Sequence, residues 1–428
     1  MNRMLVLCIA CWGCAAADSG AGVALLHRAD EAAARLEDQL LAPYRARHPG
    51  LEVAERHVAL PAAEYRRLLL VAAAREALPD VFQLDDIGVP AVVDRGHALD
   101  LAPSLGRVGV DLTRFDPTVL AMFRRGAGIY ALPRGFTPLV VVYNRDLLDR
   151  AGIAAPTGDW TWDDFGLAAR RLTRDEDGDG RIDHWGVVFD RRPAIWIAWI
   201  WAGGGDVLCA DGRRASGCLD SPVTVAAIRW YASWVAPGRA GGPVAPRARD
   251  ARDSNAAGDG LFAAGRVAFM TVDHGAVPNL RAAAAAGRLR LGFVSIPRRA
   301  GSEPATVLYA SGYAAPANLL RRKAAVELAA DLTDSVADAT RGEAGIELPA
   351  VTAAAAALAA ADTLGWEAVF LRAAARGRAT WGARVAQWGE VEAALTDLMD
   401  RVTVDGADPA RSARATAREL DRLLGATR

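Results

Sequence analysis

Residues 126–165, GAGIYALPRGFTPLVVVYNRDLLDRAGIAAPTGDWTWDDF, decide the fold of this chain. Three successive valines, residues 140–142, show no polar alternation and predict a strand that is buried on both faces. Such a strand belongs to a parallel or mixed sheet with helices on each side. Because Pro133 and Pro138 cannot donate ladder hydrogen bonds, the segment between them is expected to cross between domains and to enter a new sheet at Leu139.

Composition sets the broad class of the protein. A chain of 428 residues with 52% hydrophobic content is long enough for two domains with sizeable cores. Lys plus Arg is 50 and Asp plus Glu is 51, which gives a formal net charge of −1. This balance provides no electrostatic argument for a nucleic-acid partner.

The first residues predict an export signal. The apolar run over residues 4–13 is too short to span a membrane, because a spanning helix needs about 20 apolar residues. Gly13-Cys14 resembles a lipoprotein cleavage site, which would make Cys14 the lipidated amino terminus. Cleavage at Ala10-Cys11 or after residues 15–17 is the alternative. We expect residues 1–20 to be a leader and the mature chain to be periplasmic or at the cell surface, tethered by a lipid.

Two of the five cysteines, Cys209 and Cys218, lie beyond this leader. They flank Asp211-Gly212, which is the signal of a tight hairpin turn. Since an exported chain meets an oxidising compartment, we expect a disulfide between them, worth about 2.5 kcal/mol on the chain-entropy estimate. Two free thiols are the alternative.

Strands and helices alternate after the leader. Strands are predicted over residues 23–26, 51–58 and 80–84, and helices over residues 35–47 and 64–78. This β-α-β-α-β order is typical of a doubly wound sheet.

Ligands of such sheets bind beyond the carboxyl ends of the strands. Asp85 and Asp86 follow the third predicted strand and can accept hydrogen bonds from ligand hydroxyls. For Asp86 the alternative is a cap on the following helix.

A tryptophan-rich helix is followed by glycines at residues 203–205. Trp196, Trp199 and Trp201 cannot all face one direction on a helix, so one of them is expected to turn toward a ligand. Gly204 allows the backbone to approach a ligand closely, and Asp206 adds a carboxylate. A phosphate-binding loop is disfavoured because no Lys-Ser or Lys-Thr follows.

An acidic segment over residues 175–183 matches the start of an EF-hand calcium loop. Gly186 occupies the position of the bidentate acid, and Arg174 and Arg181 oppose a cation. We therefore expect a surface turn that binds no metal, with calcium as the alternative.

An ordered set of motifs carries a resemblance to a known family. The chain resembles the bacterial extracellular solute-binding proteins of ABC importers, in the family-1 group that takes up sugars. The motifs are Tyr130-Ala131-Leu132-Pro133, Tyr143-Asn144-Arg145-Asp146-Leu147, Ala151-Gly152-Ile153 and Trp160-Thr161-Trp162-Asp163-Asp164-Phe165. The resemblance implies a two-lobed α/β fold of the type II-like periplasmic-binding-protein kind, in which each lobe is a doubly wound mixed sheet with helices.

The resemblance also implies that the chain crosses between the lobes three times, the third time over residues 345–350. The expected N-terminal lobe comprises residues 21–135 plus 305–345. The expected C-terminal lobe comprises residues 136–304 plus 346–428. Lobes linked in this way can close on a ligand in the cleft between them.

Ligand contacts are expected where the family places its cleft loops. A sugar needs polar groups for its hydroxyls and aromatic rings for its apolar faces. The candidate ligand contacts are Asp85, Asp86, Tyr130, Trp199, Gly204, Asp206, Asp273, His274, Gly312 and Tyr313.

The expected function is capture of a sugar or oligosaccharide and its delivery to an ABC permease in the membrane. The expected protein is a monomer that is not an enzyme, needs no cofactor and binds no nucleic acid. A binding protein for a peptide, polyamine or organic phosphate is the alternative. An exported carbohydrate-active enzyme is a further alternative, which would need paired carboxylates such as Asp85 with Asp273 at a defined separation. The sequence contains neither G-x-S-x-G nor H-E-x-x-H.

Overall fold

The computed structural model describes residues 22–235, 242–246 and 260–425. Cys14 and the rest of the predicted leader lie outside these residues. The described chain divides into two compact units. Unit 1 comprises the described parts of Met1–Phe136, Tyr309–Leu358 and Ala379–Ala386. Unit 2 comprises the described parts of Thr137–Leu308, Ala359–Arg378 and Gln387–Arg428.

The division differs in detail from the boundaries predicted from the sequence. Residues 346–358 and 379–386 belong to unit 1, whereas the sequence placed them in the second lobe. The predicted third crossing, residues 345–350, lies inside unit 1, because Leu348 forms a β-bridge with Phe136.

The larger sheet is mixed and has six strands in the order β12-β11-β3-β1-β2, with β6 also paired to β11. Most of it belongs to unit 1, whereas Gly377 and Arg378 of β12, the end of β6 and the start of β11 belong to unit 2. Strand β1 is parallel to β2 and β3, and β11 is antiparallel to β3. The parallel core is therefore the β-α-β-α-β unit that the sequence predicts. The strands are β1 (Gly22–Arg28), β2 (Glu52–Val58), β3 (Val81–Asp85), β6 (Leu132–Pro138), β11 (Thr306–Ala314) and β12 (Gly377–Ala379), beside a small pair β4 (Arg124–Arg125) and β5 (Gly128–Ile129).

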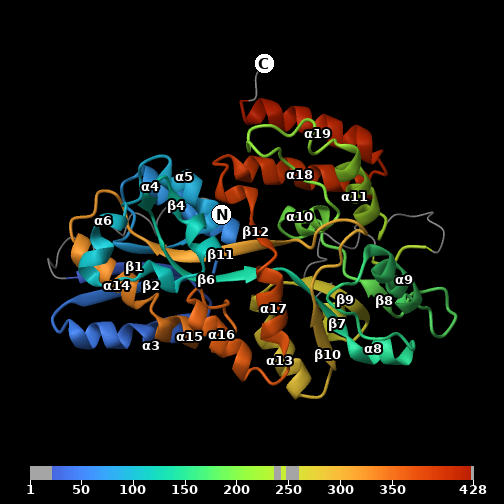
Figure 1. Cartoon of the computed structure of the whole chain (residues 1–428), viewed down its shortest axis with the longest axis horizontal. Coiled ribbons are helices and arrows are strands. Elements are labelled where there is room, and N and C mark those ends of the chain that lie inside the picture. The colour runs from blue at the N-terminus through green and yellow to red at the C-terminus, as the bar shows by residue number, and fades with distance from the viewer. Residues whose placement is uncertain (1–21, 236–241, 247–259, 426–428) are drawn as a thin grey trace. The chain divides into compact units, whose positions relative to one another are not determined.

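Two long helices cover the parallel strands of unit 1, with α3 (Glu31–Arg47) below them and α4 (Ala62–Ala74) above them in Figure 1. Asp30 begins α3, because its carboxylate accepts hydrogen bonds from the N–H groups of Ala32 and Ala33. The shorter helices of this unit are α5 (Val89–Val93), α6 (Ala102–Leu105), α7 (Pro117–Met122), α14 (Arg322–Asp331), α15 (Ser335–Glu343), η1 (Asp86–Gly88), η2 (Gly106–Val108), η3 (Leu112–Arg114) and η6 (Trp381–Ala383); α16 (Thr352–Ala361) runs on into unit 2.

Unit 2 contains a mixed sheet of four strands in the order β10-β7-β9-β8. Residues 140–142 are buried in β7, as predicted, but β7 is antiparallel to both of its neighbours. Only β8 and β9 are parallel, which makes the sheet mixed. The strands are β7 (Val140–Asn144), β8 (Trp185–Val187), β9 (Val267–Val272) and β10 (Leu291–Val294).

Helices surround this second sheet. Thr161 begins α9 through a capping box with Asp164, which confirms the predicted N-cap. Of the helices in the described ranges, none is both long enough and apolar enough to cross a bilayer. The helices of unit 2 are α8 (Arg145–Arg150), α9 (Trp162–Leu172), α10 (Pro193–Ala202), α11 (Pro222–Ala232), η5 (His274–Ala276), α13 (Val277–Ala285), α17 (Trp366–Ala374), α18 (Trp388–Thr403) and α19 (Pro409–Leu423).

Cys209 and Cys218 of unit 2 are joined by a disulfide, with Cα atoms 5.4 Å apart. The intervening loop is held by hydrogen bonds from the Cys209 N–H to the Arg214 carbonyl (2.7 Å) and from the Gly212 N–H to the Cys209 carbonyl (2.8 Å). It consists of turns and lacks the paired strands of a hairpin.

Candidate functional site

Asp85 and Asp86 follow β3 in unit 1. The Asp85 carboxylate accepts hydrogen bonds from Nη1 of Arg66 (2.8 Å) and from the N–H of Gly88 (2.7 Å), so Asp85 rather than Asp86 caps η1. Asp86 is 1% exposed, and its Oδ1 accepts a hydrogen bond from the N–H of Ala310 (3.1 Å). Burial, and then the charge of Asp85, raise the pKa of Asp86 to about 8. Asp86 is therefore protonated and shielded at neutral pH, and Asp85 is the one that reaches solvent.

Trp381 is 8% exposed and is a neighbour of the Asp85 site that sequence reasoning missed. The short helix η6, which begins with Trp381, packs against η1 at the end of β3. Cζ of Arg384 lies 5.7 Å from the centre of the Trp381 ring. The two short helices are far apart in the sequence, and no local pattern in the tail points to this packing.

Tyr130, Gly312 and Tyr313 have different surroundings in unit 1. Tyr130 is half-buried and retains access to solvent. Gly312 is buried, and a Cβ added there would lie 2.7 Å from the carbonyl oxygen of Leu132. Tyr313 is 0% exposed and donates a hydrogen bond to Oε2 of Glu37 (3.0 Å). Tyr130 can meet a ligand, whereas Gly312 and Tyr313 lie in the interior.

The partner of Tyr313 belongs to a buried charge cluster, which we call the Glu37 cluster: Glu37, Arg134, Tyr313 and Arg341. Arg341 donates from Nε and Nη2 to the two carboxylate oxygens of Glu37, both at 2.7 Å. Burial alone would raise the pKa of Glu37, but Arg341 and then Arg134 outweigh it and hold the pKa well below its usual range. The cluster fixes α3 to β6, β11 and α15, and all four of its side chains are buried.

Trp199 lies in the aromatic core of unit 2 and is 1% exposed. Its ring centre lies 4.8 Å from that of Trp234 and 5.2 Å from that of Phe165. Its Nε1 donates a hydrogen bond to Oγ1 of Thr271 (3.1 Å). These contacts make Trp199 a core residue rather than an exposed sugar platform.

Trp201, two residues further along α10, lies beside the predicted glycine loop. Its Nε1 donates a hydrogen bond to Oδ1 of Asp206 (2.8 Å). Cζ of Arg378 lies 4.0 Å from the centre of the Trp201 ring, and Nη1 lies 3.6 Å from Oδ2 of Asp206. Gly204 is exposed, with a positive φ of 81° that glycine adopts without strain. The structure therefore brings Asp206 together with Trp201, one of the three tryptophans of which the sequence expects one to face a ligand, and with Arg378, which the sequence did not single out. The Trp201 side chain itself is 4% exposed.

Asp273 and His274 follow β9 in unit 2, and His274 begins η5. Asp273 is exposed, whereas His274 is 0% exposed and its Nε2 lies 2.7 Å from Oε2 of the equally buried Glu367. Arg281 donates a second charged hydrogen bond to Glu367 (3.0 Å). Asp273 can meet a ligand, whereas His274 joins the start of η5 to α17.

The acidic loop brings carboxylate oxygens of Asp175, Asp177 and Asp183 within 4.8 Å of one another. The Asp175 carboxylate accepts hydrogen bonds from the N–H groups of Gly178 (2.7 Å) and Gly180 (2.8 Å). This is the pattern of an acidic surface turn. That the loop binds no metal stays a prediction.

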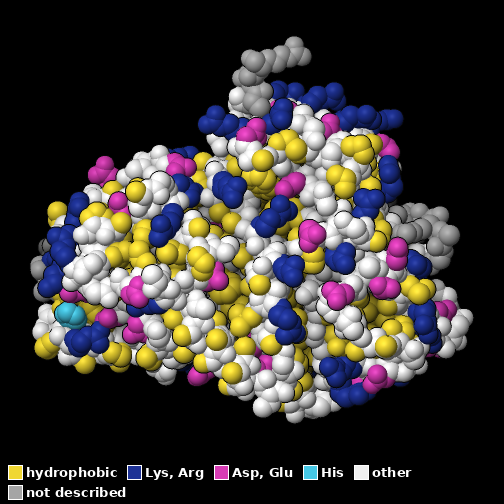
Figure 2. Space-filling view, viewed as in Figure 1, with side chains coloured by type: hydrophobic (Ala, Val, Ile, Leu, Met, Phe, Trp, Pro, Cys, Tyr) yellow, Lys and Arg dark blue, Asp and Glu magenta, His cyan; other side chains and the backbone are white. Residues whose placement is uncertain are grey.

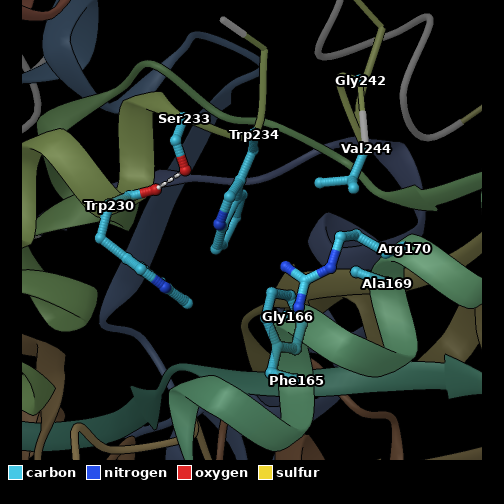
Figure 3. A pocket seen from close by; sticks show the side chains of 9 residues that line it. All are labelled: Phe165, Gly166, Ala169, Arg170, Trp230, Ser233, Trp234, Gly242 and Val244. Carbon is cyan, nitrogen blue, oxygen red and sulfur yellow. Dashed lines mark hydrogen bonds between the residues drawn. The ribbon is translucent and has the colours of Figure 1, made fainter. Parts of the chain in front are cut away.

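Two hollows lie apart from these candidates. Figure 3 shows Trp230 and Trp234 facing Phe165 and Arg170 across a cavity of about 20 Å³ in unit 2, room for about one water molecule. A hollow of about 700 Å³ in unit 1 is lined by Gly22, Ala24, Leu25, Glu52, Ala54, Arg56, residues 76–80, Pro316 and residues 318–321. The second hollow lies at the amino ends of β1 and β2, whereas Asp85 marks the carboxyl end of the sheet where ligands bind.

Solved structures share this fold. An ABC substrate-binding protein from Listeria monocytogenes in complex with cycloalternan is 18% identical, with a TM-score of 0.82 over 95% of this chain and 99% of that one. The GacH receptor of Streptomyces glaucescens, solved unliganded and with acarbose, is 19% identical, with a TM-score of 0.79 over 95% and 100% of the two chains. UgpB from Mycobacterium tuberculosis in complex with glycerophosphocholine is 23% identical, with a TM-score of 0.79 over 94% and 98%. These likenesses confirm the predicted fold class, the two-lobed α/β periplasmic-binding-protein fold.

The family follows from a match in sequence. The family model described as bacterial extracellular solute-binding protein matches residues 29–339, which is well over half of the chain. The matched span includes Asp85, Tyr130, Asp206 and Asp273. The chain therefore belongs to the bacterial extracellular solute-binding protein family.

Proposed function

We propose that this chain is the substrate-binding component of an ABC importer and that it binds a sugar or oligosaccharide for delivery to a membrane permease. The family and the oligosaccharide-type ligands in the structures of the Listeria and Streptomyces proteins support this substrate class. Partly or fully exposed polar side chains in each unit provide the chemistry: Asp206 and Arg378 in unit 2, and Asp85 and Tyr130 in unit 1.

The grouping of Trp201, Asp206 and Arg378 in unit 2 carries the proposal. A sugar presents hydroxyls that need acceptors and donors, and Asp206 and Arg378 supply both. The Arg378 guanidinium contacts both the Trp201 ring and Asp206, and the side chain is half exposed, so it can donate to a ligand while these contacts limit its freedom. Asp85, Tyr130 and Trp381 are the matching candidates in unit 1.

The proposed action is binding without chemical change of the solute, by an exported monomer held at the membrane through a lipid on Cys14. The cleft between the lobes stays a prediction from the sequence, as does closure around the solute. A ligand that prefers one conformation shifts the population toward it, and this would give the permease a loaded form to recognise.

An organic phosphate is the second candidate solute. Arg378 favours it, because a guanidinium binds phosphate oxygens in a bidentate manner. UgpB, which shares the fold, is in complex with glycerophosphocholine.

A thermal-shift screen followed by calorimetric titration tests the proposal. The panel contains linear and cyclic glucose oligosaccharides, glycerophosphocholine, peptides and polyamines. We expect a glycan to raise Tm and to bind with one site per chain. Asp206→Ala should weaken that binding at least about tenfold, the loss of a charged hydrogen bond of about 1.5 kcal/mol or more. The exposed Asp159→Ala is the matched control and should bind like the unmodified chain. Binding of glycerophosphocholine alone would select the second candidate.

A further inference from the structure

The last helix, α19, carries a row of arginines on its outer face. Arg411, Arg414, Arg418 and Arg422 are all exposed, and at 100° per residue they fall within an arc of about 80°. The opposite face is buried and packs against α18; it consists of Ser412, Ala413, Thr416, Ala417 and Leu420. Packing of this inner face therefore holds the four guanidinium groups, here called the arginine face, toward solvent.

The arginine face is unusual in its electrostatics. In the described part of the chain, no ion pair joins any of its four guanidinium groups to a carboxylate. Successive members lie three or four residues apart, where like charges repel and destabilise a helix. The full sequence balances 50 basic against 51 acidic residues, so the row is a local concentration rather than a general excess.

A neighbouring loop extends the positive surface. Asp421 of α19 accepts hydrogen bonds from the N–H groups of Ala215 (2.6 Å) and Ser216 (3.2 Å). This anchors the disulfide loop beside the arginine face, with Arg213 and Arg214 exposed. Figure 2 shows dark blue side chains along the edge of the molecule where Figure 1 places α19.

We propose that the arginine face docks on the anionic surface of a phospholipid membrane. Guanidinium groups bind headgroup phosphates in a bidentate manner, and each basic side chain near an anionic leaflet adds attraction. A rigid row about 16 Å long, from Arg411 to Arg422 at 1.5 Å per residue, meets a flat surface along its whole length. The predicted lipid on Cys14 would hold the chain at such a surface, and stable attachment takes two signals.

The composition of the arginine face favours a membrane over other anionic partners. Besides the arginines, the outer face carries Ala415 and Glu419, and the half-buried Asp421 lies at its edge. It has no aromatic ring on which a base of a nucleic acid can stack. It also has no large apolar side chain to fill a pocket on a protein partner. We therefore expect the arginine face to bind the headgroups electrostatically, without insertion of side chains into the hydrocarbon of the membrane.

Vesicle co-sedimentation of the full chain tests the proposal. The measured quantity is the increase in bound protein when about a third of a neutral phosphatidylcholine vesicle is replaced by anionic phosphatidylglycerol. This increment cancels any binding that residues 1–21 contribute to both kinds of vesicle. The test variant changes all four members of the arginine face to Gln. The matched control changes four exposed arginines of unit 1 to Gln: Arg75, Arg95, Arg107 and Arg124.

We expect the anionic increment of the unmodified chain to fall steeply when salt rises from about 0.05 M to about 0.5 M, because screening shortens the reach of the charges. At low salt, the partition coefficient of the test variant on anionic vesicles should be at least about tenfold lower than that of the unmodified chain. The control variant should have the partition coefficient of the unmodified chain. Equal increments for the test variant and the unmodified chain would overturn the proposal. So would binding to single-stranded DNA without an anionic increment. Both variants should retain the Tm of the unmodified chain within a few degrees, which excludes misfolding as the cause.

Discussion

Nη2 of Arg134 lies 2.9 Å from Oε1 of Glu37, and the two side chains are 3% and 0% exposed. Arg134 belongs to β6, one of the strands that runs on into unit 2, and its Nη1 also donates to Oε2 of Glu347 (2.9 Å). Burying a charge costs free energy that only close partners offset. The Glu37 cluster therefore holds the first part of β6, the part that contains Arg134, within unit 1.

Glu37→Gln should destabilise the protein strongly. The change leaves Arg134 and Arg341 buried without their shared countercharge, and removal of one partner of a buried pair costs about 3–5 kcal/mol. Urea unfolding followed by circular dichroism measures the loss. Glu31→Gln is the control, because Glu31 lies on the same helix with its side chain 87% exposed. A loss below about 1 kcal/mol for Glu37→Gln would contradict this role of the cluster.

Asp86→Asn should stabilise the protein increasingly as pH rises. The folded pKa of Asp86 is raised to about 8, so its contribution to stability is full below the unfolded pKa of about 4 and is lost as pH rises toward 8. Asparagine does not ionise, so the variant does not lose stability in this way as pH rises. Between pH 5 and pH 8 the difference in unfolding free energy between variant and unmodified chain should grow by up to about 4 kcal/mol. The exposed Asp159→Asn should show no such trend, and a pH-independent effect of Asp86→Asn would refute the assignment.

Trp199→Ala should cost stability. The ring fills the aromatic core of unit 2, and deletion of a buried tryptophan typically costs about 3–5 kcal/mol. Leu167→Ala on α9 is the control, since Leu167 is 55% exposed. If Trp199→Ala abolished ligand binding at unchanged stability, Trp199 would instead be the ligand contact that the sequence predicts.

Replacement of Cys209 and Cys218 together by Ser should lower the unfolding free energy by about 2.5 kcal/mol, the chain-entropy value for so short a loop. A reducing agent should lower the Tm of the unmodified chain by about as many degrees as the double substitution does. The double variant should be insensitive to it. A reductant-insensitive unmodified chain would show that the disulfide contributes nothing.

Much of the fold was predictable because local sequence patterns determine many of its helices and strands. The uninterrupted valines of residues 140–142 give β7, and the Thr161-Asp164 spacing gives the start of α9. Strand direction was not predictable, because β7 is buried like a parallel strand yet pairs antiparallel with β9 and β10. Burial on both faces of a strand indicates that helices cover both faces of its sheet. It does not indicate whether neighbouring strands are parallel or antiparallel.

The candidate site was less predictable. The helix α10 is buried nearly all round, so its sequence gives no periodic signal to separate Trp199 in the core from Trp201 beside Asp206. Asp85, Asp206 and Asp273 reach solvent, and their place at the ends of β3, α10 and β9 was readable from the order of elements. Arg378 and Trp381 lie in the C-terminal part of the chain. Their positions near the candidate residues depend on long-range packing, which local sequence patterns do not show.

Isothermal titration with the glycan that raises Tm most, followed by chromatography of the recovered ligand, tests the central claim most directly. The account predicts saturable binding at one site per chain and recovery of the glycan unchanged after prolonged incubation. Hydrolysis of the glycan, or saturable binding of glycerophosphocholine with no binding of any glycan, would contradict it.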